Sequence, residues 1–494
     1  MLRKLIDSPW TYFALAALLV VIAVASQIES VGEDAPSGTA VDLESLGDRE
    51  DLNVIFILID TLRADRLGAY GYERDTSPNM DALAARGIRF GQVESQSSWT
   101  KTSMASLMTA RYPERTGIMR AEDALPEDAV LPAEIFRDAG YNTAGVWRNG
   151  WVANNFGFDQ GFGLYYKPLA DRSNRAVQRN SPSAHRLAGS DLDVTRSAIE
   201  FITNHRDDRF FLYMHYMDVH QYVYSDASPT WGTSFSDIYD SSIHWVDQNV
   251  GLIAQTLFDE ELLDRTIIVI AADHGEAFFE HGAEGHARTL YHEVQNVPLI
   301  IVVPLRLDEG IVVEEKVANI DIWPTVLDLA GLPPIPGAEG RSLVPLILDG
   351  GDTSELASGL RDRSLFAQLE QNWGKRTKES DQLVSMLDGP YRYVVRANDT
   401  DRFEIYDHST DPLEKNDLAE EGEVSRDELQ GKVDSFLELG GPTWGQSPKV
   451  PVDEMMQAQL RALGYVFTMT DADEVRRREE HVKELQQNRK WKAD

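Results

Sequence analysis

The feature that most constrains this chain is an unbroken apolar run, Val54–Ile59, which ends in Asp60. A strand that is buried on both faces has this appearance, and such strands belong to parallel sheets covered by helices. The pattern returns along the chain, with strands expected at 142–147, 210–215, 266–272 and 297–303 and helices at 131–139, 191–204 and 237–258. This alternation predicts an α/β fold, a doubly wound, mostly parallel sheet flanked by helices. Because ligands bind at the carboxyl ends of such strands, polar residues there are candidate site residues.

Composition divides the rest of the chain. The alternating pattern fills residues 52–350, the expected catalytic domain, and a small C-terminal α+β subdomain is expected at 351–470. In the subdomain, strands at 391–395 and 403–406 are predicted to form a hairpin. Residues 28–51 are polar and acidic, as in a linker, and residues 471–494 are charged with helical spacing, as in a solvated terminal helix.

The first 27 residues predict a membrane segment or a targeting signal. Arg3 and Lys4 precede an uncharged apolar stretch from Trp10 to Ala25. As a signal anchor, this stretch would make the chain a single-pass protein of the cell membrane with its catalytic domain outside the cytoplasm. The alternative is a cleaved signal peptide, which would leave an exported or periplasmic protein.

Charge and cysteine content exclude several classes of site. The 494-residue chain has a formal net charge of -34, so nucleic acid is not expected as a partner. It contains no cysteine, which excludes disulfides, thiolate metal sites and cysteine nucleophiles.

Three polar clusters lie where chemistry is expected. Asp60 follows the first strand, Asp273 and His274 follow the strand at 266–272, and Thr100 starts an apolar helical stretch. Adjacent oxygen and nitrogen ligands suit Zn²⁺ or Mn²⁺ better than Ca²⁺, and a hydroxyl at a helix start lies where backbone N–H groups favour an anion. Taken one at a time, Asp60 and Thr100 are more often helix caps, and an Asp-His pair is more often structural.

The order of these clusters changes that balance. Together with further motifs they resemble the sulfatase family of the alkaline phosphatase superfamily over about residues 53–466. The matching stretches are Asn53–Tyr72, Thr76–Phe90, Trp99–Gly117, Phe156–Phe162, His215–His220, Ala272–Glu276, Gly285–Pro298, Asp321–Gly331, Ile405–Pro412 and Leu460–Val466.

The resemblance implies the residues of a site. It implies one divalent metal ion (Mn, Zn, Ca or Mg) held by Asp60, Thr100, Asp273 and His274, with Thr100 as the nucleophile. His220 and His286 match positions that bind the anionic group of the ester or protonate the leaving group, and Asn149 matches a pocket position loosely. Structural roles are expected for the histidines His215, His281 and His292, and local salt bridges for Arg63 and Arg66.

The nucleophile position departs from the pattern of the family. Sulfatases make formylglycine from Cys or Ser in a Cys/Ser-x-Pro-x-Arg stretch, whereas this chain has Thr100 there, with neither Pro at 102 nor Arg at 104. Threonine cannot yield that aldehyde because its β-carbon carries a methyl group, so no formylglycine is expected. Thr61 also replaces a second acidic metal ligand, and Asp218 with His220 fits a second metal site only in part.

A threonine nucleophile resembles instead the phosphotransferases and phosphodiesterases of the same superfamily. We therefore expect a metal-dependent hydrolase, or transferase, that cleaves a phosphate or phosphonate ester of a small molecule, glycan or lipid headgroup. One alternative is a sulfuric ester hydrolase that works without formylglycine. The other is a non-catalytic member that binds an anion.

Overall fold

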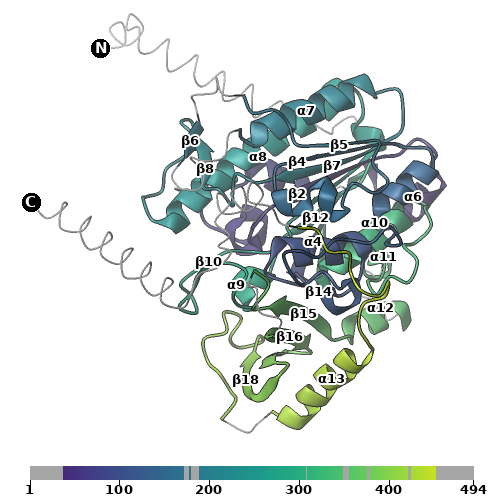
Figure 1. Cartoon of the computed structure of the whole chain (residues 1–494). Helices are drawn as coiled ribbons and strands as arrows, with labels where there is room; N and C mark the ends of the chain where they lie inside the picture. Colours follow the sequence, from purple (N-terminus) through teal and green to yellow (C-terminus); the bar gives the residue numbers. More distant parts are fainter. Residues whose placement is uncertain are drawn as a thin grey trace, which may run out of the picture.

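The centre of the molecule is an eight-stranded sheet in the order β14-β3-β12-β9-β2-β7-β4-β5 (Figure 1). The computed structural model describes residues 37–171, 177–179, 189–307, 309–348, 355–374, 379–420 and 424–451. The strands of the sheet are β2 (Asn53–Ile59), β3 (Ile88–Glu94), β4 (Asn142–Trp147), β5 (Leu164–Tyr166), β7 (Phe210–Tyr216), β9 (Thr266–Ala271), β12 (Leu299–Val302) and β14 (Ile311–Ala318).

The sheet is mixed, with a parallel core. Strands β9, β2, β7, β4 and β5 run parallel in that order, and β14 is parallel to β3. Strand β12 is antiparallel to both of its neighbours, β3 and β9. The apolar run at 297–303 therefore predicted a strand correctly but carried no information on its direction.

Helices cover both faces of this sheet, as the continuous apolar strands predicted. Figure 1 shows α7 (Asp191–Asn204) and α8 (Phe235–Asp259) on one side and α4 (Thr100–Thr109) and α10 (Ile322–Leu329) on the other. Trp323 of α10 packs edge-on against two rings of the sheet. Its ring centroid lies 5.0 Å from that of Phe56 in β2 and 5.4 Å from that of Phe211 in β7. Every residue of β2 is buried, which explains its uninterrupted hydrophobic sequence.

Local sequence sets the ends of the long helices. Ser234 precedes α8, and its hydroxyl accepts a hydrogen bond from the N–H of Asp237 at 3.1 Å. Ser190 precedes α7, and its own N–H is bonded by the carboxylate of Asp193 at 2.9 Å. Both pairs satisfy N–H groups that a helix start leaves without a partner.

A second sheet lies toward the C-terminal end of the chain. It is antiparallel, in the order β15-β16-β17-β18, and α13 (Arg426–Glu438) packs on it through Leu429 and Val433. Its strands are β15 (Leu365–Glu370), β16 (Gln382–Asp388), β17 (Tyr391–Arg396) and β18 (Asp399–Asp407). The predicted hairpin corresponds to β17 and β18. The division of the whole chain into domains stays a prediction.

Short elements connect these parts. They are α3 (Pro78–Ala84), α5 (Pro113–Thr116), α6 (Pro132–Asp138), α9 (His292–Gln295), α11 (Val344–Leu348), α12 (Glu355–Arg361), β1 (Ser37–Gly38), β6 (Val177–Arg179), β8 (Val223–Ser225), β10 (Ala277–Phe278), β11 (Glu284–Gly285) and β13 (Arg306–Leu307). Within the segment expected to be a linker, residues 40–48 form a 3₁₀ helix that buries Leu43 and Leu46.

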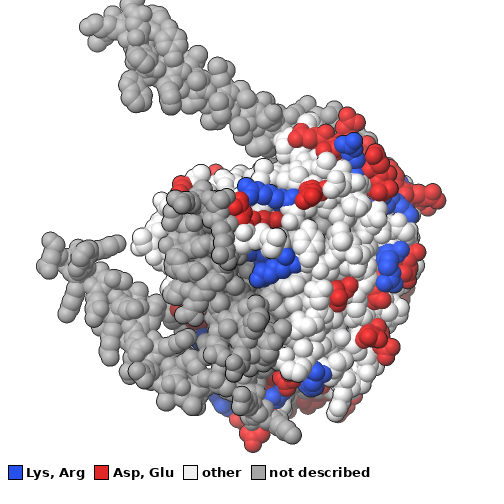
Figure 2. Space-filling view, turned by 45° about the horizontal axis from the view of Figure 1, so that its top comes forward, with Lys and Arg blue, Asp and Glu red and all other residues white. Residues whose placement is uncertain are grey.

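The expected membrane segment, residues 1–27, and the charged tail, residues 471–494, lie outside the described residues. In the part that the structure describes, no helix is both long and apolar enough to cross a bilayer. The face seen in Figure 2 carries scattered acidic groups with isolated basic groups among them, and the residues described on that face form no continuous basic patch.

Candidate active site

The sheet brings the predicted site residues to one edge. Asp60 follows β2, and Asp273 and His274 follow its parallel neighbour β9. Asn149 and His220 follow β4 and β7, which continue the parallel core on the other side of β2. Thr100 is the first residue of α4 and is fully buried. Residues from five separate segments thus meet where the strands end, as expected for a parallel sheet.

Two buried carboxylates and one imidazole form a site that fits a metal ion. The ligating atoms of Asp60, Asp273 and His274 lie within 4.8 Å of one another, and all three side chains are buried. Among the described residues, Asp60 Oδ1 and Asp273 Oδ2 have no hydrogen-bond partner. Burial of such oxygens without a partner is costly, and a divalent cation between them would remove that cost. Two carboxylates with one imidazole are a donor set that Zn²⁺ and Mn²⁺ accept.

The two carboxylates, Asp60 and Asp273, lie close enough to shift each other's protonation, and their pKa values move in opposite directions. Burial together with the charge of Asp60 raises the pKa of Asp273 to about 6. Burial alone would raise the pKa of Asp60 as well, but the neighbouring histidines His220, His215 and His274 hold it well below its usual range. Of two like charges held this close, one is destabilised, and a bound cation relieves that repulsion.

The other oxygens of these carboxylates are held in place. Asp60 Oδ2 accepts a hydrogen bond from Asn149 Nδ2 at 2.6 Å and lies 3.1 Å from His215 Nε2. Asp273 Oδ1 accepts from the backbone N–H of Thr61 at 3.2 Å. Each carboxylate therefore uses one oxygen within the protein and keeps the other for a ligand.

Thr100 lies next to this site. Its Oγ1 is 3.1 Å from His274 Nε2 and 3.5 Å from Asn149 Nδ2. His274 Nδ1 is 2.9 Å from the carbonyl oxygen of Gly275, which can only accept, so we assign the ring proton to Nδ1. The lone pair on Nε2 then faces the Thr100 hydroxyl and the unpartnered carboxylate oxygen.

Two further histidines close the site on one side. The ring of His286 lies 4.8 Å from that of His220 and 4.6 Å from that of His274. Burial lowers the pKa of His220 to about 4 and holds that of His286 well below its usual range. Glu276 lies 3.1 Å from His286 Nδ1 and is itself buried.

Two of these contacts were missed from the sequence. His215 was expected to be structural, yet it is fully buried and joins Asp60 to the hydroxyl of Tyr213, 2.6 Å from its Nδ1. Its position at the end of the strand paired with β2 was the available signal, since it is the register partner of Leu58. Glu276 lay in a recognised motif but was given no role.

The remaining expectations concern residues around the site. His281 bonds Glu293 and the carbonyl of Glu414, as a structural residue would. Arg63 pairs with Asp65, and Arg66 pairs with Asp240. The backbone N–H of His292 donates to Glu414 at 2.9 Å.

Asp218, the partial fit to a second metal site, is engaged elsewhere. Its carboxylate is paired with the buried guanidinium of Arg148, which also binds Asp191 at 2.8 Å. The other oxygen of Asp218 accepts from Trp245 Nε1 at 2.9 Å. This ion-paired carboxylate anchors the loops that carry Asn149 and His220.

Comparisons with known proteins agree with this geometry. The sequence model of the sulfatase family matches residues 52–332, more than half of the chain. The chain belongs to the sulfatase family. A second model, N-sulphoglucosamine sulphohydrolase, C-terminal, matches residues 280–438. This sulfatase-family chain is thus an ester hydrolase of the alkaline phosphatase superfamily.

Individual relatives are distant. Human N-acetylgalactosamine-6-sulfatase is 27% identical over 361 residues, which cover 64% of this chain and 67% of that protein. The ulvan-active sulfatase of Formosa agariphila is 26% identical over 435 residues, 78% of this chain and 81% of that protein. The crystal structure of the phosphonate monoester hydrolase of Agrobacterium radiobacter has a TM-score of 0.62 at 19% identity, covering 78% of this chain and 95% of that one. The last likeness shows a common fold.

Proposed function

We propose that this sulfatase-family chain is a metal-dependent hydrolase that cleaves a phosphate or phosphonate ester with Thr100 as its nucleophile. One observation carries the proposal. The Thr100 hydroxyl lies 3.1 Å from His274 Nε2, beside two buried carboxylates that each keep one unpartnered oxygen. A hydroxyl in that position can be activated by the cation that the carboxylates would hold.

The metal would be held by Asp60, Asp273, His274 and the Thr100 hydroxyl. When bound, a divalent cation lowers the pKa of a hydroxyl group and neutralises charge on phosphoryl oxygens. We expect Mn²⁺ or Zn²⁺ because the donor set contains an imidazole. Thr61 occupies the place of a further acidic ligand, and its hydroxyl donates to the backbone carbonyl of Asp60 at 2.6 Å.

The side chains divide the reaction between them. Thr100 Oγ1 loses its proton to solvent, attacks the phosphorus and forms a phosphothreonine, while the bond to the leaving oxygen breaks. Asn149 Nδ2 and the backbone N–H groups at the start of α4 stabilise the charge on the non-bridging oxygens. The leaving oxygen takes a proton from the neutral ring of His286, which recovers one at Nδ1 from the buried carboxyl of Glu276, whose pKa burial raises to about 7. His220 donates a hydrogen bond to the same oxygen. Water then attacks the phosphothreonine and releases phosphate or phosphonate.

A second candidate is hydrolysis of a sulfuric ester. The names of the relatives favour it, since N-acetylgalactosamine-6-sulfatase and the ulvan-active sulfatase are both sulfatases. Thr100 cannot become formylglycine, so the ester would be cleaved by direct attack of Thr100 or of water. An alcohol in place of water in the second step would make the chain a transferase, and a chain inactive on every ester would be an anion-binding member.

Substrate class and location belong to the same proposal. The relatives are named for a sulfated amino sugar and for ulvan, which favours a glycan ester over a lipid-headgroup ester. Residues 1–27 would anchor the chain in the membrane or direct its export, since basic residues precede an apolar stretch. Protease accessibility in intact cells and in disrupted cells tests that placement.

The deciding experiment is an activity panel. The purified chain is stripped of metal, then assayed with Mn²⁺, Zn²⁺ or Ca²⁺ on aryl sulfate, aryl phosphate, aryl phosphodiester and aryl phosphonate. Thr100→Ala is compared with Thr102→Ala, a matched control on the same helix whose hydroxyl donates to the Ile118 carbonyl at 2.8 Å.

Each outcome of the panel has a distinct meaning. Phosphoester or phosphonate turnover that requires metal, survives Thr102→Ala and disappears in Thr100→Ala supports the proposal. Sulfate turnover lost in Thr100→Ala selects the second candidate with the same nucleophile. Turnover that survives Thr100→Ala rules out Thr100 as the nucleophile.

A further inference from the structure

The backbone turn after β2 is strained at one residue. Thr61 has a φ of 62°, in the left-handed region, which a β-branched residue enters only at a cost of about 1–2 kcal/mol. In this conformation its N–H points to Asp273 Oδ1, 3.2 Å away. The strained residue thus orients one metal-binding carboxylate while it directly follows another, Asp60.

The hydroxyl of Tyr239 holds this turn from the opposite side. It donates to the carbonyl of Thr61 at 2.6 Å and accepts from the N–H of Arg63 at 2.9 Å. Tyr239 is fully buried near the start of α8. The two bonds fix the peptide groups on both sides of Leu62, so Thr61 cannot relax to a right-handed conformation without losing them.

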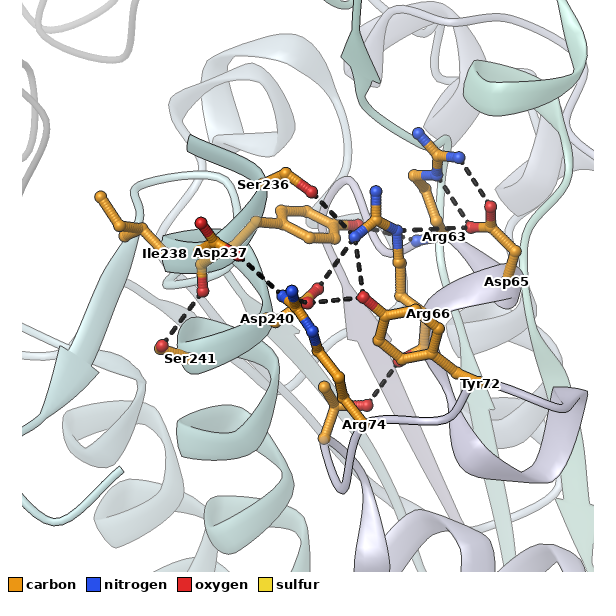
Figure 3. A network of polar contacts seen from close by, with 12 residues as sticks. Arg63, Asp65, Arg66, Tyr72, Arg74, Ser236, Asp237, Ile238, Asp240 and Ser241 are labelled. Atoms are coloured by element: carbon orange, nitrogen blue, oxygen red, sulfur yellow. Dashed lines mark hydrogen bonds and ion pairs between the residues drawn. The ribbon is translucent and has the colours of Figure 1, made fainter. Parts of the chain in front are cut away.

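Ion pairs join the turn of α8 that carries Tyr239 to the segment after Thr61, residues 63–74 (Figure 3). Arg66 and Arg74 of that segment face Asp237 and Asp240 of α8 in this view, whereas Arg63 faces Asp65. The carboxylate of Asp240 is fully buried and accepts from Arg66 at 3.2 Å and from Arg74 at 2.6 Å. Asp240 directly follows Tyr239 in α8, so these ion pairs hold the helix turn that carries the tyrosine.

Arg63 extends the connection to the second metal-binding loop. Its guanidinium donates to the carbonyl of Glu276 at 2.9 Å and pairs with Glu280. Asp273 and His274 begin that loop. The turn at Thr61 is therefore bonded to α8 through Tyr239. Through Arg63 it is also bonded to the loop that begins with Asp273 and His274.

We propose that Tyr239 is a positioning residue for metal binding. Its hydroxyl keeps Thr61 in the left-handed conformation, so that the Thr61 N–H, together with the N–H of His274, holds one oxygen of Asp273 and leaves the other for the cation. Tyr239 does not touch the site itself. This inference rests on the metal site of the proposed function, and its test separates the two.

The test measures the affinity of the metal-stripped chain for Mn²⁺ by titration calorimetry. Loss of an outer contact to a metal ligand costs about 10- to 100-fold in affinity, and we expect Tyr239→Phe to weaken Mn²⁺ binding by at least about tenfold. The matched control is Tyr216→Phe. Tyr216 is equally buried, but its hydroxyl bonds Thr195 at 2.7 Å, so its removal should leave Mn²⁺ affinity within about twofold of the original.

A second substitution identifies the route by which Tyr239 acts. Glycine adopts the left-handed conformation at no steric cost, so Thr61→Gly added to Tyr239→Phe should restore at least about threefold in Mn²⁺ affinity. Circular dichroism checks that each variant is folded.

Three results would count against the inference or its basis. Equal Mn²⁺ affinities of Tyr239→Phe and Tyr216→Phe would overturn the role of Tyr239. A double variant no better than Tyr239→Phe would overturn its action through Thr61. If the unsubstituted chain binds no Mn²⁺, Zn²⁺ or Ca²⁺, the metal site of the proposed function is itself wrong.

Discussion

Replacement of Glu414 by Gln should change how the stability of this protein depends on pH. Glu414 is buried between the two sheets, where its carboxylate pairs with Arg392 and His408. Arg392 in turn donates to Glu94 of β3 at 2.8 Å. Burial alone would raise the pKa of Glu414, but Arg392 and His408 outweigh burial and lower the pKa from 4.5 to about 2.

The size of the effect follows from that difference. Each pKa unit corresponds to about 1.4 kcal/mol, so a lowering from 4.5 to about 2 stabilises the folded state by roughly 3 kcal/mol. Because the folded pKa lies below the unfolded one, this contribution is fully present above pH 4.5. It is lost as the pH falls toward 2, when the folded protein also takes up the proton.

Urea unfolding of Glu414→Gln and the unsubstituted chain at a series of pH values tests this. We expect the variant to be less stable by about 3 kcal/mol at pH 7, and the difference to shrink steadily between pH 5 and pH 2. Glu428→Gln, on the exposed face of α13, serves as the control and should leave the pH dependence unchanged. A stability difference that stays constant from pH 7 to pH 2 would refute the reasoning.

Three further predictions concern the site and its supports. Arg148→Met leaves Asp191 and Asp218 buried without their cation and should lower the free energy of unfolding by about 3–5 kcal/mol, measured with urea; a loss below about 1 kcal/mol would contradict this. Glu276→Gln should slow hydrolysis of esters with poor leaving groups by about 10²-fold, because Glu276 acts on the leaving oxygen through His286. Activated aryl esters should be hydrolysed as before, and an equal loss on both kinds of ester would exclude a role of Glu276 in protonating the leaving group. Removal of metal by a chelator should lower stability by about 4 kcal/mol relative to protein with cation at about 1,000 times Kd, and urea curves that coincide would exclude a tight site.

Much of the fold could be predicted from residue pattern. The strand at Val54–Ile59 is read from its continuous apolar sequence because both faces of β2 are covered, and α7 and α8 are read from their periodicity. The strands β3 and β14 were missed because exposed and half-buried residues interrupt their apolar pattern. The antiparallel direction of β12 has no local signature, since strand pairing is decided by partners distant in the chain.

The candidate site divides in a similar way. Asp60, Thr100, Asp273 and His274 could be singled out because each directly follows a strand or begins a helix, and their order along the chain resembles a family. Such positions are determined by neighbours in sequence, which is why motifs report them.

What the sequence by itself determined was the set of elements, their alternation and the residues at their ends. Only the tertiary structure decided which of those residues touch: that His215 and Asn149 hold one oxygen of Asp60, and that Tyr239 holds the turn at Thr61. The physical reason is range. Local patterns depend on residues a few positions apart, whereas these contacts join segments as much as 178 residues apart, through the pairing and packing of the whole sheet.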